Sequence, residues 1–97
     1  MLTTYDEDAH VLTVAGDTSG EATETLRGLL DQHTGGFSEG LVVDLTGVTY
    51  LPSVAIGLLV RAGESCRASG ASLELAARAG SAAHRVLTVS AIPFRSY

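Results

Sequence analysis

Three residues in this sequence have side chains of the types that form a hydrolytic triad, namely Ser53, His84 and Asp44. Such a triad needs the histidine to activate the serine and the carboxylate to orient the histidine. The residues around the serine are Leu51-Pro52-Ser53-Val54-Ala55, which lack the Gly-x-Ser-x-Gly turn that presents a nucleophilic serine. Asp44 is also a single carboxylate, and without a paired acid or base it does not provide a catalytic mechanism. The sequence therefore predicts no enzyme.

Other chemistry-bearing residues are equally scattered. Gly35-Gly36 and Gly40 are not followed by Lys-Ser or Lys-Thr, so they do not form a phosphate-binding loop. The single cysteine, Cys66, excludes an internal disulfide and a cysteine metal cluster, and its place in an expected helix indicates a small core residue. The histidines lie in three separate expected elements without metal-ligand spacing: His10, His33 and His84. We expect neither a metal nor a cofactor.

Ser53 lies between two apolar segments that organise the chain. Leu41–Val43 is a Val-rich run too short for a helix, which predicts a buried central strand ending at Asp44 and turning through Gly47. Pro52 lacks a backbone donor and disfavours helical geometry at the residue before it, so the following helix cannot begin earlier. Ser53 is then the expected N-cap. It is either a plain cap or a phosphoacceptor, because a helix tolerates a phosphate at its positive end.

The residues around Ser53 also match a family pattern. Asp44-Leu45-Thr46-Gly47-Val48-Thr49-Tyr50-Leu51, followed by Ser53 and Ile56-Gly57, resembles the signature of STAS domains, which include bacterial anti-sigma factor antagonists. That signature reads Asp-Leu-Ser-Gly-Val, an aromatic and an apolar residue, then Asp-Ser-Ser-Gly-Leu-Gly. Ser53 matches the phosphorylated serine of the family and Gly57 its later glycine. Three positions depart from the pattern: Pro52 replaces Asp, Val54 replaces the second Ser, and Ala55 replaces Gly.

The resemblance implies a function. Such a protein docks on an anti-sigma factor with the fold of an ATPase kinase and thereby frees a sigma factor for transcription. The kinase would phosphorylate Ser53, and a phosphatase would restore it. Asp44, Gly47 and Gly57 would support this site structurally.

A second hypothesis keeps the STAS domain without the switch. The chain would then be a non-phosphorylated scaffold subunit of a larger sensory or lipid-transporter complex, which the departures from the family pattern favour.

The second predicted helix, from about residue 54 to 69 with Gly70 as its terminator, has first turns that are apolar all round. Either other elements bury this end, or part of it contacts a partner. We expect the partner-binding residues to be Pro52, Ser53, Val54, Leu58 and Arg61. The last three should then be more exposed than the inward-facing residues Ala55, Leu59 and Ala62.

The length predicts one domain spanning residues 1–97, and the alternation of expected strands and helices predicts that it is an α/β domain. A hydrophobic content of 45% with 18% charged residues is typical of a globular chain. The net charge of −5 argues against a nucleic-acid partner. The first ten residues lack a signal peptide, and the longest apolar run, Val54–Val60, is too short to insert in a membrane. We therefore expect a cytoplasmic protein.

The pattern of elements predicts a mixed sheet of four to five strands with about three helices. The first two strands pair as an antiparallel hairpin, and the third and fourth flank the second helix as a βαβ unit. The first helix should begin with a capping box of Thr18 and Glu21, and the third should follow Ser81 and end at Pro93. A short last strand would follow, and the C-terminal helix usual in the family is missing or short.

Overall fold

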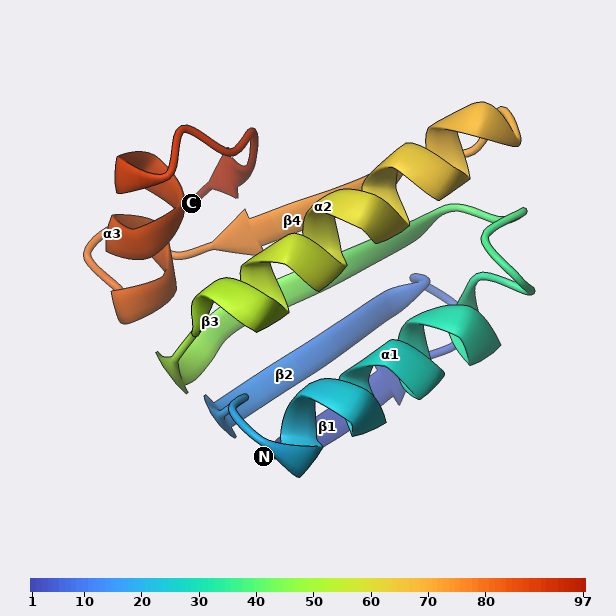
Figure 1. Cartoon of the computed structure of the whole chain (residues 1–97). Coiled ribbons are helices and arrows are strands. Elements are labelled where there is room, and N and C mark those ends of the chain that lie inside the picture. Colours follow the sequence, from blue (N-terminus) through green and yellow to red (C-terminus); the bar gives the residue numbers. More distant parts are fainter.

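The computed structural model describes residues 1–97 and shows an α/β fold in which three helices accompany a five-stranded sheet (Figure 1). The strands lie in the order β1-β2-β3-β4-β5, with β1 antiparallel to β2 and all other neighbours parallel. The predicted mixed sheet, its hairpin and its βαβ unit are confirmed. The elements are β1 Leu2–Asp6, β2 Val11–Asp17, α1 Glu21–His33, β3 Leu41–Tyr50, α2 Ser53–Ala68, β4 Leu73–Ala77, α3 Ala82–Val89 and β5 Arg95–Ser96.

The core lies between the sheet and the two long helices, α1 and α2, which cover the same face (Figure 1). On β3, burial alternates as a strand requires, with Leu41, Val43 and Leu45 buried and the residues between them partly exposed. Both α1 and α2 bury a stripe against this face, and Cys66 on α2 is buried as predicted. Burial of its apolar side chains in the core thus accounts for the central place of β3 in the sheet, as the sequence indicates.

β3 does not end at Asp44 as predicted but continues through Gly47 to Tyr50. The expected turn is instead an irregularity in the pairing, because Thr13 faces Asp44 whereas Ala15 already faces Gly47. One extra residue on β3 is accommodated there, which is what a β-bulge does. A Cβ on Gly47 would lie 2.9 Å from the Cβ of Ala15, so only glycine fits this close approach of the two strands.

The predicted cap of α3 is confirmed, whereas that of α1 is wrong. The Ser81 hydroxyl accepts a hydrogen bond from the amide of His84 at 3.1 Å and caps α3, although that helix ends at Val89, before Pro93. The cap of α1 is Gly20, without a side-chain hydrogen bond, so Thr18 and Glu21 form no capping box. The Thr18 hydroxyl instead donates a hydrogen bond to the Tyr50 carbonyl at the end of β3.

Candidate functional site

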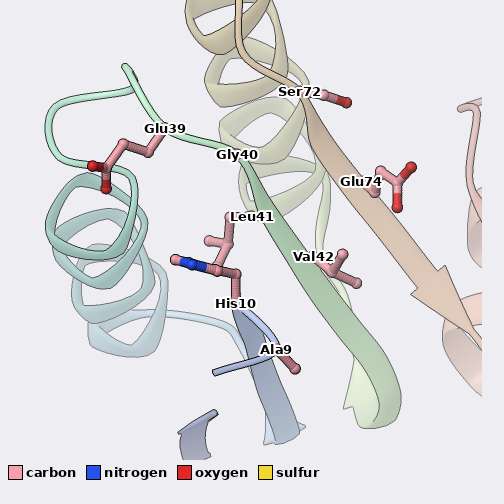
Figure 2. Close-up of a pocket in the computed structure, with 8 residues that line it drawn as sticks. All are labelled: Ala9, His10, Glu39, Gly40, Leu41, Val42, Ser72 and Glu74. Atoms are coloured by element: carbon pink, nitrogen blue, oxygen red, sulfur yellow. The ribbon is translucent and has the colours of Figure 1, made fainter. Parts of the chain in front are cut away.

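A hollow at the end of the sheet where β3 and β4 begin contains several titratable side chains (Figure 2). The titratable side chains that line this hollow do not bond to one another. Nδ1 of His10 lies 3.2 Å from the Tyr5 hydroxyl, and Glu74 forms an ion pair with Arg95. The hollow therefore contains no hydrogen bond between a histidine and a carboxylate. Nowhere in the chain do three His, Cys, Asp or Glu side chains converge as metal ligands would. The residues that line the hollow are Ala9, His10, Glu39, Gly40, Leu41, Val42, Ser72 and Glu74.

Ser53 lies just beyond the opposite end of β3 and is the first residue of α2. The prediction that Ser53 caps the helix is wrong, because Pro52 takes that position. Pro52 has extended backbone geometry, with φ −72° and ψ 164°, and its carbonyl accepts the first helical hydrogen bond from Ile56 at 3.0 Å. The Ser53 side chain is exposed and its hydroxyl makes no capping hydrogen bond. The hydroxyl is therefore accessible and has no partner within the chain.

Large exposed apolar side chains lie close to Ser53 in the sequence. Tyr50 is 56% exposed and Val54 is 63% exposed, whereas Leu51 between them is buried in the core. We call Tyr50, Pro52, Ser53 and Val54 the Ser53 surface. Exposed aromatic and aliphatic side chains grouped in this way are typical of a contact with another protein.

The predicted partner face is wrong at Leu58. This side chain is only 3% exposed, as buried as Leu59 and Ala62, which were expected to face inward. It lies in the groove between α1 and α2, beside Phe37. The buried stripe of α2 is wide because it must cover both the sheet and α1. Arg61 is exposed, as expected, and so is Val54.

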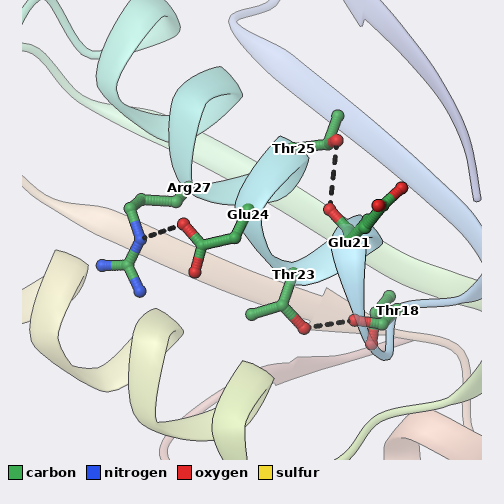
Figure 3. A network of polar contacts seen from close by, with 6 residues as sticks. All are labelled: Thr18, Glu21, Thr23, Glu24, Thr25 and Arg27. Carbon is green, nitrogen blue, oxygen red and sulfur yellow. Dashed lines mark hydrogen bonds and ion pairs between the residues drawn. The ribbon is translucent and has the colours of Figure 1, made fainter.

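The loop before α1 forms the other edge of the Ser53 surface. Thr18 is fully buried and donates hydrogen bonds to the Tyr50 carbonyl from its amide at 3.1 Å and its hydroxyl at 2.9 Å. The Thr23 hydroxyl on α1 in turn donates to the Thr18 carbonyl (Figure 3). These bonds hold Tyr50 against the start of α1. This role of Thr18 could not be predicted from the sequence, because Thr18 and Glu21 together match the pattern of a capping box.

Asp17 also lies at this edge, since it pairs with Tyr50 in the register of β2 and β3. Hydrogen bonds from Ser19, one of them from its amide to the Asp17 carboxylate at 2.8 Å, lower the pKa of this carboxyl. The Ser53 surface therefore has a fixed negative charge beside it.

Asp44 bonds to the backbone just after it on β3 and to the C-terminal segment. Its carboxylate accepts hydrogen bonds from the Thr46 amide at 2.9 Å and from the Tyr97 hydroxyl at 2.5 Å, and none from the amides at the start of α2. Partial burial alone would raise the pKa of Asp44, but the hydrogen bonds from Tyr97 and Thr46 outweigh it and keep the pKa below its ordinary value. Asp44 thus ties the C-terminal segment to β3.

No triad connects Ser53, His84 and Asp44. The His84 ring lies on α3, edge-on to Phe94 with ring centroids 5.3 Å apart, and no hydrogen bond joins it to either of the other two. Gly57 lies on α2, with the Arg61 guanidinium over its backbone.

A sequence model of the family described as "Mlab, STAS domain" matches residues 1–92. The chain belongs to the STAS domain family. The resemblance carried by residues 44–57 is thus confirmed at the level of the family, which includes the anti-sigma factor antagonists and is generally non-enzymatic. A comparison with curated proteins finds none that matches this STAS domain. None of its helices combines the length and the apolar character needed to cross a membrane.

Proposed function

We propose that this STAS domain is an anti-sigma factor antagonist that binds its partner through the Ser53 surface and is released when Ser53 is phosphorylated. The partner is an anti-sigma factor with the ATPase-kinase fold, and its capture frees a sigma factor. One observation carries the proposal: Ser53 has an exposed, unbonded hydroxyl, and two exposed apolar residues, Tyr50 and Val54, lie close to it in the sequence.

Phosphorylation at this position favours dissociation for electrostatic reasons. A phosphate adds about −1.5 to −2 charges at neutral pH. Inside an apolar contact made by Tyr50 and Val54, that charge would lose its hydration, which weakens binding. The fold itself should persist, because negative charge is favourable in the first turn of a helix. A phosphatase would then restore binding.

The first experiment identifies the partner and the modification together. Affinity capture from the native cell should recover an ATPase-fold anti-sigma factor, and incubation with that protein and ATP should add one phosphate at Ser53, located by mass spectrometry. Ser53→Ala should bind constitutively and Ser53→Asp weakly. Capture of a transporter or sensory complex, with Ser53 unmodified, would instead favour the scaffold hypothesis.

The second experiment tests the surface with a matched pair of substitutions. Val54→Glu should weaken binding of the captured partner by at least about tenfold, because it places a charge in the apolar contact. Val89→Glu is the control, since Val89 is 86% exposed on α3, outside the Ser53 surface. Equal loss of binding in both variants would contradict the assignment of the interface.

A further inference from the structure

Arg61 has a guanidinium that no carboxylate neutralises. The ion pairs of the molecule join Arg27 to Glu24 and Arg95 to Glu74. Arg61 is exposed and lies instead along its own helix, where a Cβ on Gly57 would be 3.2 Å from its Nη1 atom. The guanidinium therefore occupies the space that the missing side chain of Gly57 leaves open.

Ser53, Gly57 and Arg61 follow one row along α2, each four residues from the next. Side chains in a helix point toward its N-terminus, which explains why the Arg61 guanidinium lies over Gly57. Four residues correspond to a rise of about 6 Å. The guanidinium is thus about one turn from Ser53, with no side chain between them.

We infer that Arg61 is the intramolecular counterion of a phosphate on Ser53. This inference rests on the proposed phosphorylation of Ser53. Arginine and phosphate form strong charge-assisted hydrogen bonds, and the length of both side chains allows them to meet over Gly57. In the unmodified protein the Arg61 charge is available to an acidic group of the partner. In the phosphorylated protein the phosphate holds it, so the modification both adds charge and withdraws a cation from the interface.

The charged groups around Arg61 are consistent with this role. Glu24, Arg27 and Asp31 line the groove between α1 and α2 with it, but Glu24 is already paired with Arg27 (Figure 3). Asp31 forms no ion pair with Arg61 at a distance of 4.0 Å or less. A phosphate on Ser53 therefore has no competitor already bound to the Arg61 guanidinium.

The test uses the full chain with phosphoserine incorporated genetically at position 53, so it needs neither kinase nor partner. Titration followed by ³¹P NMR measures the second pKa of the phosphate. A guanidinium in contact with the phosphate, with the two charges about 4 Å apart, should lower that pKa by about 0.8 units. Arg61→Gln should remove this shift, and Arg61→Lys should retain part of it.

Two further variants separate a direct contact from a general effect of charge. Arg67→Gln removes the same charge in the last turn of α2 and should leave the phosphate pKa as in the parent protein. Gly57→Ala places a methyl group where the guanidinium lies and should reduce the shift. An unchanged phosphate pKa in Arg61→Gln would overturn the inference, as would an equal change in Arg67→Gln. Failure of the kinase to modify Ser53 would refute the proposed function while leaving this measurement intact.

Discussion

Two hydroxyl groups seven residues apart on the same segment, those of Thr46 and Ser53, have opposite surroundings. The Thr46 hydroxyl on β3 accepts a hydrogen bond from the Arg78 amide at 2.9 Å and lies 2.7 Å from the Tyr97 hydroxyl. Because Tyr97 gives its proton to Asp44, Thr46 is the donor toward Tyr97. Ser53, seven residues later, has no such partner. Thr46 therefore contributes to holding the C-terminal segment on β3, whereas the Ser53 hydroxyl is exposed and unbonded.

Several neighbours of the Ser53 surface are buried in the core. Leu51 and Leu58 are buried on either side of Ser53 in the sequence, and Thr18 fixes the Tyr50 carbonyl. The exposed members of the surface can change with little effect on the fold, whereas their buried neighbours cannot. The predictions below test this division of roles.

The largest effect on stability is expected at Leu58. Leu58→Glu should lower the free energy of unfolding by more than about 3 kcal/mol, because a buried apolar contact is lost and a charge is left without a partner. Val54→Glu should change it by only about 0.5 kcal/mol, as is usual at the surface. Urea denaturation of the two variants measures the difference. If Leu58→Glu were as stable as the parent, Leu58 would belong to the exposed face after all.

A smaller loss is expected at the irregular pairing of β2 and β3. Gly47→Ala should cost about 1–3 kcal/mol, since the new methyl group would lie 2.9 Å from the Cβ of Ala15. Adding Ala15→Gly removes that clash, so the double variant should recover much of the loss. A double-mutant cycle on the free energy of unfolding reports this coupling. Strictly additive effects would show that the two positions are not in contact.

These positions also show which parts of the fold the sequence can predict. The central strand follows from a short Val-rich run, and the Ser81 cap follows from local chemistry confined to a few residues. Leu58 could not be placed, because the first turns of α2 are apolar all round and give no preferred face. Only the position of α1 decides that Leu58 is buried. The start of α2 was predicted correctly, but its cap was not, because Pro52 itself supplies the extended cap geometry.

The hydrogen bonds around Asp44 could not be predicted from local sequence patterns for a different reason, which is that their partners are far apart in the sequence. Tyr97 reaches Asp44 across 53 residues of sequence, and the bonds from Thr18 to Tyr50 span 32. Thr18 has the residue type and spacing of a helix cap. Its hydroxyl nevertheless forms a long-range hydrogen bond to the Tyr50 carbonyl in place of the predicted cap of α1. Contacts of this kind depend on the assembled sheet.

An effect of about 1 kcal/mol is expected from the hydrogen bond between Tyr97 and Asp44. The hydrogen bonds lower the pKa of Asp44 in the folded protein below its ordinary value of 3.8. The stabilisation is therefore complete above about pH 5 and is lost as the pH falls through the folded pKa. Tyr97→Phe should be less stable than the parent at pH 7, and the difference should shrink in acid. A difference independent of pH would mean that Tyr97 stabilises by packing alone.

The smallest effect is expected at Ser53, and it tests the comparison most directly. Ser53→Ala should change the free energy of unfolding by less than about 0.5 kcal/mol, because no hydrogen bond is lost. Ser81→Ala is the matched control: its hydroxyl caps α3, so its removal should cost about 1 kcal/mol, seen as a fall in Tm of about 4–8 °C for a domain of this size. Thermal unfolding of both variants under identical conditions gives the answer. Equal losses would show that the Ser53 hydroxyl is bonded in solution and is not free for phosphorylation without a cost to the fold.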